Sequence, residues 1–382
     1  MAGVHAIGAV ESVDELLGEV GRHGRTLRFA LVPRVVFLIV DALPPRHVTP
    51  AVMPVLSALA GEGGSSVGRA VMTSATYPNH ATFATGVDPL VHGIVANWIV
   101  HEGRPTPSNE VGPSVPTIFD ACATAGRSSA AVLGDQHLVG VMGARAADSH
   151  WPPDGVLADD VVRDGHGYVA NAEVLERLLP VLDRDRPELV VAHLNEPDTE
   201  AHIHGPDSDG ALASYRAADS AIAQIAAALR PTWDDTVFIV VSDHDQEDVD
   251  EPIDLYPPAA ATGLPLVPIP EGTAAIVWGA DETNGAWLDR VDGILGHREL
   301  RPDVRLVWSV PRRWFTPPAG FLSGPPDRGT HGGIRTRSQV AVVAGGHSTA
   351  VALAARVAER DQVEAPEWAG IITGLLGISP SW

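Results

Sequence analysis

Four short runs of β-branched and other apolar residues constrain this chain most, because each stops abruptly at polar residues or glycines. The runs and the residues after them are Val35–Val40 before Asp41, Leu189–Leu194 before Asn195, Glu196 and Asp198, Val237–Val241 before Asp243 and His244, and Val340–Val343 before Gly345 and Gly346. Such runs are typical of buried parallel strands with a site at their carboxyl ends.

Helical patterns lie between these runs, and the clearest has apolar residues at Leu212, Tyr215, Ile222, Ile225 and Leu229. A further helix is expected over Val115–Ala125 and a further strand over Ala130–Leu133. Strands that alternate with helices predict an α/β fold, in which ligands bind beyond the carboxyl ends of the strands.

The composition is that of a globular protein large enough to enclose a substantial core. Hydrophobic residues make up 45% of the 382 residues and charged residues 19%. No internal repeat or low-complexity tract is evident, and we expect residues 1–382 to form a single domain.

A dense cluster of prolines within Glu251–Pro270 predicts irregular structure and a boundary inside this domain. After it come a strand-like run, a helical pattern and a second strand-like run, at Thr273–Trp278, Ala286–Leu295 and Val304–Trp308. We expect these to form a small β-α-β insertion, with residues 257–318 as a cap over the site and Ser323–Gly333 as the return to the main sheet.

Charge and cysteine content narrow the classes of partner. The formal net charge of −22 disfavours a nucleic acid polymer, whose phosphates would be repelled. Cys122 is the only cysteine, so an intramolecular disulfide and a cysteine-based zinc ribbon are excluded. Any metal must therefore be bound by oxygen and nitrogen ligands.

No targeting or membrane segment is recognisable in the sequence. Met1–Val20 lacks a basic start and an uninterrupted apolar stretch, so we expect no signal peptide. The longest strongly apolar run, Val35–Val40, is far shorter than the roughly 20 residues that span a bilayer. We therefore expect a cytoplasmic protein without a membrane partner.

Six acidic and histidine residues form a candidate metal-binding set. They are Asp41, Asp198, His202, Asp243, His244 and His331. Three carboxylates and three imidazoles suit zinc and would supply two ions with about three ligands each. Asp198 and His202 are four residues apart, so one helical turn brings both to the same ion.

Thr76 is a candidate nucleophile. It lies in Thr73–His80, just before Ala81–Gly86, which reads as a short helix ending in glycine. A hydroxyl in the turn before a helix meets free backbone N–H groups and the positive end of the helix dipole, although an ordinary threonine cap gives the same pattern. A threonine hydroxyl needs a base or a metal to lower its pKa, and the candidate ligands favour a metal.

Five segments together carry a resemblance to a known family. They are Ile39-Val40-Asp41; Thr76-Tyr-Pro-Asn-His80 with Thr85-Gly86 and His92-Gly93-Ile94; Glu196-Pro-Asp198 through His202 and Gly205-Pro206; Ser242-Asp-His244; and Gly329-Thr-His331-Gly332. In this order and spacing, the chain resembles the nucleotide pyrophosphatase/phosphodiesterase branch of the alkaline phosphatase superfamily. The resemblance implies a central, mostly parallel sheet flanked by helices, and hydrolysis of phosphodiester or pyrophosphate bonds in small nucleotide-type substrates.

The resemblance also implies roles for individual residues. One zinc ion would be bound by Asp198, His202 and His331. The other would be bound by Asp41, Asp243, His244 and the hydroxyl of Thr76. Thr76 would attack phosphorus in line and form a covalent phosphothreonine intermediate, and Asn79 would donate a hydrogen bond to a phosphoryl oxygen. Other divalent metals remain possible.

The chain departs from the family pattern at three points. Ala201 and Asp245 stand where relatives usually have glycine, and no secretion signal is evident. Asp245 is followed by Gln246, Glu247 and Asp248, and these extra carboxylates could bind another ion, tune zinc affinity or repel anionic substrates. His204 forms a His-x-His pair with His202, but we expect it to be exposed to solvent.

The leaving group and the reaction subclass stay open. Tyr77, Trp98 and Trp151 are candidates for stacking on a base or aryl group, and Glu196 and His193 lie close to the ligands. A phosphomonoesterase or phosphonate hydrolase could use the same site, but such sites usually add cationic contacts, and Arg46 is the one arginine close in sequence to the ligand at the first strand end. A non-catalytic metal-binding relative is the third reading, although no expected ligand is missing.

Overall fold

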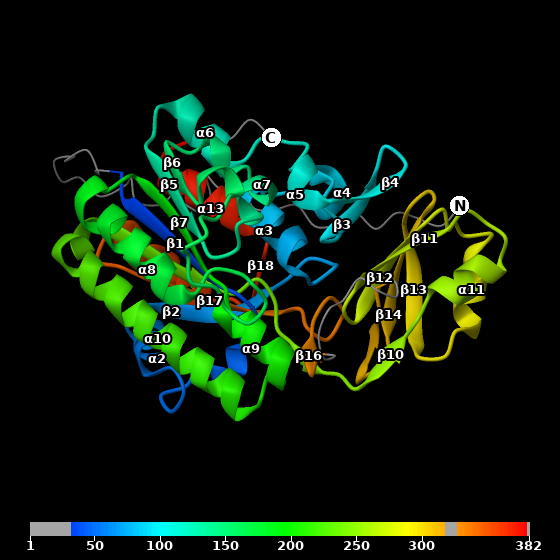
Figure 1. Ribbon diagram of the computed structural model, residues 1–382. Helices are drawn as coiled ribbons and strands as arrows, with labels where there is room; N and C mark the ends of the chain where they lie inside the picture. The colour runs from blue at the N-terminus through cyan, green and yellow to red at the C-terminus, as the bar shows by residue number, and fades with distance from the viewer. Residues whose placement is uncertain (1–31, 318–326, 380–382) are drawn as a thin grey trace.

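The computed structural model describes residues 32–317 and 327–379. An eight-stranded sheet lies at its centre, in the order β18-β2-β17-β8-β1-β7-β5-β6 (Figure 1). In that order the strands span Gln362–Glu364, Gly64–Arg69, Ser338–Ala344, Thr236–Val241, Arg34–Val40, Leu189–Leu194, Ser129–Leu133 and Ser149–Trp151. All neighbouring strands are parallel except for β17, which runs antiparallel to β2 and β8. The predicted α/β class with a mostly parallel sheet is confirmed.

The four apolar runs lie in β1, β7, β8 and β17, so each is a strand as predicted. The expectation that all four are parallel is wrong for Val340–Val343, because the chain enters β17 from the edge of the sheet that carries Asp41 and Asp243. Gly345 and Gly346 therefore follow β17 at the opposite edge. The segment before β17, which includes His331, lies on the ligand side instead.

Helices cover both faces of the sheet because β1 alternates its side chains between them. Val36, Leu38 and Val40 pack with apolar residues of α2 (Pro54–Glu62), α8 (Asn171–Pro180) and α10 (Asp209–Leu229). Val35, Phe37 and Ile39 pack on the other face, against α3 (Thr76–Thr85), α6 (Ile118–Ala125), α12 (Ser348–Ala358) and α13 (Glu367–Leu375). Both cores are almost fully buried, and this fixes the carboxyl ends of the central strands.

The predicted helix over Val115–Ala125 corresponds to α6, which begins at Ile118. Thr117 caps it, because its hydroxyl accepts the N–H of Asp120 while the Asp120 carboxylate accepts the N–H of Thr117 at 2.8 Å. The helix ends at Gly126, which adopts φ 65°. The predicted strand over Ala130–Leu133 lies in β5.

A second, antiparallel sheet stands beside the main sheet (Figure 1). Its order is β11-β12-β14-β13, with bounds Val267–Glu271, Ala274–Trp278, Val304–Ser309 and Ile294–Arg301. Beside it lie α11 (Tyr256–Ala261) and the paired short strands β10 (Glu251–Ile253) and β15 (Arg313–Phe315). The proline-rich stretch is therefore more regular than expected.

The expected helix over Ala286–Leu295 is wrong. A single 3-10 segment, η6 (Gly285–Arg290), ends before Gly293, whose φ of 91° is incompatible with a continuing helix. The chain then enters β13, which pairs with β14 along its length. Cross-strand pairing thus overrides the local helical pattern, and the segment is not a β-α-β unit.

The remaining elements are short and mostly connect the larger ones. They are η1 (Pro45–His47), α4 (Pro89–His92), β3 (Trp98–His101), β4 (Arg104–Pro107), α5 (Ser108–Val111), α7 (Leu138–Val141), η2 (Ala144–Ala146), η3 (Pro153–Gly155), η4 (Val181–Asp185), α9 (Glu196–His204), η5 (Arg230–Asp235), β9 (Glu247–Asp248) and β16 (Gly329–Thr330). None of the described helices is both long and apolar enough to cross a membrane. Met1–Val20, Pro318 and the start of Ser323–Gly333 lie outside the described residues.

Candidate active site

The six predicted ligands come together at the carboxyl edge of the central strands. Asp41 follows β1, and Asp243 and His244 follow β8. Asp198 and His202 project from α9, which begins just after β7, and His331 follows β16. All but His202 are at least nine-tenths buried. We call Asp198, His202 and His331 group A, and Asp41, Thr76, Asp243 and His244 group B.

Group A is built on one turn of α9 and the loop after β16. The Nε2 atom of His202 lies 3.4 Å from Asp198 Oδ1, and the Nε2 atom of His331 lies 3.9 Å from the same oxygen. His202 Nδ1 lies 2.9 Å from the carbonyl oxygen of Gly329, which holds the ring with Nε2 facing Asp198. The i, i+4 spacing therefore brings Asp198 and His202 together, as predicted.

Group A balances its own charge. Burial alone would raise the pKa of Asp198, but the charge of His202 and a hydrogen bond to it hold that pKa well below its usual range. Burial would lower the pKa of His202, but Asp198 and Asp327 raise it well above its usual value. The pair is therefore an internal ion pair when no cation is bound.

Group B has two carboxylates that each direct one oxygen to the same point. Asp243 Oδ1 accepts the backbone N–H groups of Ala42 and His244, at 3.0 and 3.1 Å. Asp243 Oδ2 and Asp41 Oδ1 are buried without a hydrogen-bond partner. His244 Nε2 lies 3.2 Å from Asp243 Oδ2 and 3.5 Å from Asp41 Oδ1.

These two carboxylates fit a bound cation. Burial, and then the charge of nearby carboxylates, raise the pKa values of Asp41 and Asp243 well above their usual range. Burial lowers the pKa of His244 to about 3, so its ring is neutral and its nitrogen can bind a metal. The orphaned oxygens and the neutral imidazole match the oxygen and nitrogen ligands that zinc takes.

His244 also connects the two groups. Its ring stacks on that of His331, with centroids 3.9 Å apart. Ligand atoms of Asp198, His244 and His331 lie within 4.8 Å of one another, as do those of Asp41, Asp243 and His244. The groups are thus adjacent, and His244 lies within reach of both.

Thr76 is the first residue of α3, so the helix begins five residues earlier than predicted and ends at Gly86. Its hydroxyl oxygen lies 3.2 Å from His244 Nε2, inside group B. Every residue of α3 is buried, which fixes the direction of its amino end. The threonine hydroxyl is therefore held beside the carboxylates at the positive end of the helix dipole.

The predicted role of Asn79 does not agree with its contacts. Its Nδ2 group donates to the carbonyl oxygens of Thr73 and Ala75, at 3.3 and 2.9 Å, and its Oδ1 accepts the N–H of Val71 at 2.9 Å. The side chain is fully buried. Asn79 shapes the loop that delivers Thr76, because its amide is committed to the backbone on both sides.

Asn97 is a site residue that the sequence reasoning missed. Its Oδ1 accepts the N–H of Tyr77 at 3.1 Å, so its amide lies over the amino end of α3. Its own N–H donates to the carboxylate of Glu271, at 2.8 Å, and burial raises the pKa of Glu271 to about 8. A polar residue directly after the apolar Ile94–Ala96 was the available signal.

The aromatic candidates separate into two kinds. The ring of Tyr77 is buried in the core under α3, and this disagrees with the predicted stacking role. Trp151 packs at the edge of the other core. Trp98 is half-buried at the start of β3 and packs against the second sheet, near Asn97. Of the two partly buried tryptophans, Trp98 is the one next to Asn97 in the chain, which makes it the candidate surface for a leaving group.

The acidic residues after the Asp-His pair are held by other groups. Arg46 Nη1 donates to both carboxylate oxygens of Asp245, each at 2.7 Å. Glu247 pairs with Arg335, also at 2.7 Å. Gln246 Nε2 donates to Asp198 Oδ1 at 2.6 Å. Gln246 thus holds the group A ligand Asp198 by a hydrogen bond. The charge of Asp245 is offset by that of Arg46.

His204 and Cys122 both lie outside groups A and B. The side chain of His204 is 50% exposed and pairs with Glu200 across one helical turn, which confirms the expectation of a solvent-exposed histidine. Cys122 is buried on α6, as a core residue.

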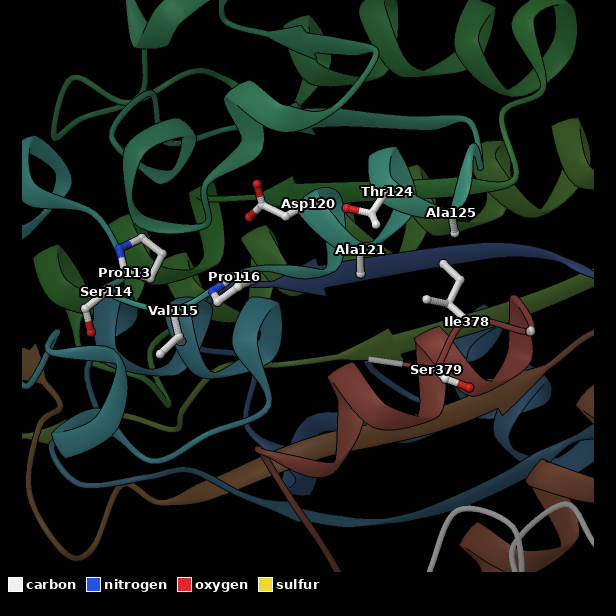
Figure 2. Close-up of a pocket in the computed structure, with 11 residues that line it drawn as sticks. Pro113, Ser114, Val115, Pro116, Asp120, Ala121, Thr124, Ala125, Ile378 and Ser379 are labelled. Carbon is white, nitrogen blue, oxygen red and sulfur yellow. The ribbon is translucent and has the colours of Figure 1, made fainter. Parts of the chain in front are cut away.

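A separate cavity of about 550 Å³ lies between the start of α6 and the end of the described chain (Figure 2). Residues that line it are Pro113, Val115, Asp120, Thr124, Ile378 and Ser379. None of the group A or group B residues lines it, and the Asp120 carboxylate caps α6. Its lining therefore lacks the titratable cluster that the strand ends possess.

Known proteins resemble this chain over most of the fold just described. The profile of the family described as type I phosphodiesterase / nucleotide pyrophosphatase matches residues 35–284. The chain belongs to this family. Membership confirms the predicted resemblance.

Curated relatives are distant and much longer. Ectonucleotide pyrophosphatase/phosphodiesterase family member 1 of Rattus norvegicus is 26% identical over 211 residues, which are 53% of this chain and 22% of that protein. The venom phosphodiesterase of Macrovipera lebetinus is 26% identical over 190 residues, which are 47% of this chain and 21% of that protein. The matched region is thus about a fifth of the length of either relative.

Solved structures share the fold. Murine ectonucleotide pyrophosphatase/phosphodiesterase 5, as an inactive variant in complex with AMP, has a TM-score of 0.68 at 15% identity, over 91% of this chain and 96% of that chain. Phosphonoacetate hydrolase from Sinorhizobium meliloti 1021, in complex with phosphonoformate, has a TM-score of 0.63 at 18% identity, over 86% and 96%. These likenesses confirm the predicted alkaline-phosphatase-like fold.

Proposed function

We propose that this protein hydrolyses phosphodiester or pyrophosphate bonds in small nucleotide-type substrates, with Thr76 as nucleophile and two divalent cations, preferably zinc, bound by groups A and B. One observation carries the proposal: the Thr76 hydroxyl lies 3.2 Å from His244 Nε2, beside two carboxylates whose inner oxygens have no partner. Family membership supports the reaction type, and an AMP complex of a murine relative supports a nucleotide-type substrate.

Cations bound by these groups would lower the pKa of the Thr76 hydroxyl and offset the charge of the transferred phosphoryl group. Thr76 Oγ1 then forms a bond to phosphorus while the bond to the leaving group breaks. Water then attacks the phosphorus of the phosphothreonine, the bond between phosphorus and Thr76 Oγ1 breaks, and a proton from that water goes to Oγ1. The buried α3 holds the hydroxyl in place through both steps.

A side-chain amide beside Thr76 supplies the hydrogen bond that stabilises the phosphoryl group. We assign this role to Asn97 in place of Asn79. Asn97 Oδ1 accepts the N–H of Tyr77, and this hydrogen bond holds the Asn97 amide next to Thr76. Asn79 is committed to the backbone.

The surroundings of Arg46 favour a diester over a monoester. A monoester carries an extra negative charge, which such sites usually meet with arginine or lysine. The sequence has no lysine, and Arg46 is held by Asp245 and Asp207 at distances of 2.7 and 3.1 Å. A phosphomonoesterase or phosphonate hydrolase therefore remains the second candidate, in line with the fold of the phosphonoacetate hydrolase.

The test compares initial rates on bis-p-nitrophenyl phosphate and p-nitrophenyl phosphate in zinc-loaded protein, together with elemental analysis. We expect about two or more zinc ions per chain and faster cleavage of the diester. Faster cleavage of the monoester would support the second candidate instead.

Two variants of α3 test the nucleophile. Thr76→Ala should remove turnover with both substrates, whereas Thr85→Ala should retain it, because the Thr85 hydroxyl only bonds the carbonyl oxygen of Ala81. Turnover by Thr76→Ala would refute the covalent mechanism. Absence of both metal and turnover in the unmodified protein would support the non-catalytic relative.

A further inference from the structure

The carboxylate of Asp41 faces two histidines on opposite sides. Its Oδ1 atom faces His244 in group B, at 3.5 Å from Nε2. Its Oδ2 atom lies 2.8 Å from Nε2 of His193, a residue of β7 that no metal group of the family resemblance includes. His193 pairs with Ile39 in the sheet register, so β1 and β7 hold the two side chains together. Both side chains are buried.

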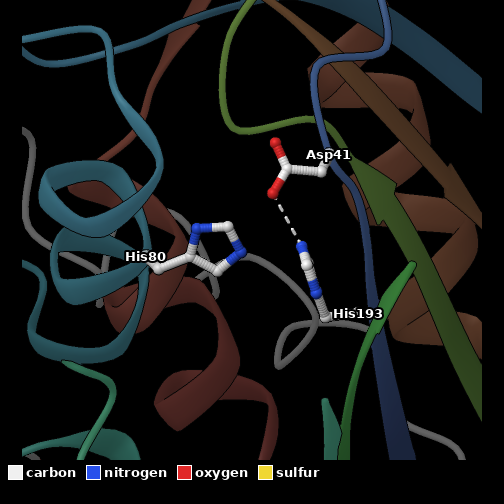
Figure 3. Close-up of side chains that lie close together, drawn as sticks. All are labelled: Asp41, His80 and His193. Carbon is white, nitrogen blue, oxygen red and sulfur yellow. Dashed lines mark hydrogen bonds and ion pairs between the residues drawn. The ribbon is translucent and has the colours of Figure 1, made fainter. Parts of the chain in front are cut away.

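His80 approaches the same pair from α3. Its Nδ1 atom lies 2.8 Å from the carbonyl oxygen of Thr76, so Nδ1 carries the hydrogen and Nε2 presents a lone pair. Nε2 is fully buried and has no hydrogen-bond partner. The rings of His80 and His193 meet edge to face, with centroids 4.9 Å apart. Figure 3 shows a ring nitrogen of His80 turned toward the Asp41–His193 pair.

We propose that Asp41, His80 and His193 bind a third divalent cation, separate from those of groups A and B. One ligand atom from each residue lies within 4.8 Å of the other two, in a fully buried setting. Two neutral imidazoles and one carboxylate favour zinc or another transition metal over magnesium, which prefers oxygen ligands.

A proton satisfies this cluster less well than a cation. A hydrogen on His193 Nε2 completes one bond to Asp41 Oδ2 but leaves the lone pair of His80 Nε2 without a donor. A cation bound between them accepts electron pairs from all three atoms. The hydrogen of His193 then resides on Nδ1, which leaves the electron pair of Nε2 for the cation.

The third cation would bridge to group B through Asp41. The proposal rests on the proposed function only in that Asp41 is also a ligand of group B. Each carboxylate oxygen of Asp41 then binds a different ion. It also places positive charge beside a part of the site where Asp41, Asp243 and Asp135 are all buried. A cation bound to Asp41 Oδ2 would thereby hold Asp41 Oδ1 in its orientation toward group B.

Metal counting tests the site without relying on turnover. Metal-free full-length protein is titrated with Zn²⁺, and bound ions are counted by native mass spectrometry. We compare the unmodified protein with His80→Gln, His193→Gln and the control His92→Gln. His92 is equally buried, but its Nε2 bonds the Thr82 hydroxyl at 3.0 Å, outside the cluster.

Three ions in the unmodified protein and in His92→Gln, with two in His80→Gln and His193→Gln, are the expected result. Two ions in the unmodified protein, with diester hydrolysis intact, would overturn the third site and leave the proposed function standing. Three ions in both cluster variants would also overturn it. His80→Gln decides the question if His193→Gln fails to fold, because His80 lies on α3 and takes no part in the strand pairing of the central sheet.

Discussion

Groups A and B both combine aspartate and histidine side chains but balance buried charge differently. In group A, Asp198 and His202 form an ion pair on one turn of α9, and Gln246 supports the carboxylate from behind. In group B, Asp41 and Asp243 face each other with unpartnered oxygens and a neutral His244 between them. Group A is therefore ordered before a cation arrives, whereas group B needs one.

This difference indicates that group B depends more on a bound metal ion than group A does. Two buried carboxylates that face each other are costly, and a cation bound between them removes that cost. The nucleophile Thr76 belongs to the group that needs the cation, so metal binding and activation of the hydroxyl are coupled there.

Metal removal should have the largest effect. Chelation is expected to reduce turnover by at least about 10³-fold, because a two-metal site stabilises both the attacking and the leaving oxygen. Zinc should restore the rate in proportion to the ions bound. The measurement is the rate on bis-p-nitrophenyl phosphate against metal content, and full turnover in metal-free protein would contradict the proposal.

Substitutions at the two aspartates should change the stability of the metal-free protein in opposite directions. Asp243→Asn removes one of two facing carboxylates and should raise the free energy of unfolding by roughly 1–3 kcal/mol. Asp198→Asn leaves His202 without its partner and should lower it by a similar amount, about 1–3 kcal/mol. Urea unfolding at pH 7 measures both.

The comparison between the groups would fail if both substitutions destabilised the metal-free protein equally. With zinc present, both variants should instead lose stability, because each removes a ligand.

The pH dependence of the metal-free protein should follow group B and Glu271. The folded-state pKa values of Asp41, Asp243 and Glu271 are raised, so their contribution to stability is present at low pH and is lost as pH rises. For Glu271 the loss should run from about 4.5 to about 8. Asp198 in group A acts oppositely, because its lowered pKa adds stability above its unfolded value.

Glu271→Gln isolates one part of this behaviour. The variant keeps an acceptor for the backbone N–H of Asn97 but cannot ionise. Its free energy of unfolding should therefore change less between pH 5 and 8, the interval that the raised pKa predicts. Chemical denaturation across that interval, with Glu282→Gln as an exposed control, is the measurement. An unchanged slope would show that Glu271 is not the group responsible.

The smallest effect is expected at Gln246. Gln246→Ala removes the 2.6 Å hydrogen bond to Asp198 Oδ1, and zinc affinity at group A should fall by about 10-fold, as for other residues that orient a metal ligand. Competitive zinc titration of this variant and of Gln224→Ala, an exposed residue of α10, tests this. Equal affinities would assign Gln246 a packing role only.

The strands and the ligands at their ends could be predicted because both are local patterns. An apolar run predicts a strand, and the polar residues that follow it at once, Asp41 in one case and Asp243 and His244 in another, are predicted as ligands by the same pattern. The i, i+4 pair on α9 is likewise a property of a single helix. These features do not depend on which distant segment lies beside them.

The remaining features depend on contacts between distant segments. The direction of β17 follows from where the chain returns after the second sheet, and β13 is a strand because β14 pairs with it. Asn79 and Asn97 are chemically identical, and only the fold decides which amide lies beside Thr76. His80 and His193 meet Asp41 from two other elements, which no local pattern reveals.

Direct trapping of the covalent intermediate is the most decisive measurement. Protein turning over bis-p-nitrophenyl phosphate is quenched in acid within milliseconds, and the peptide that contains α3 is analysed by mass spectrometry. A p-nitrophenyl phosphoryl group on Thr76, formed as the first p-nitrophenol is released, is the expected result. Full turnover with Thr76 unmodified at every quench time, or with the adduct on another residue, would contradict the proposed mechanism.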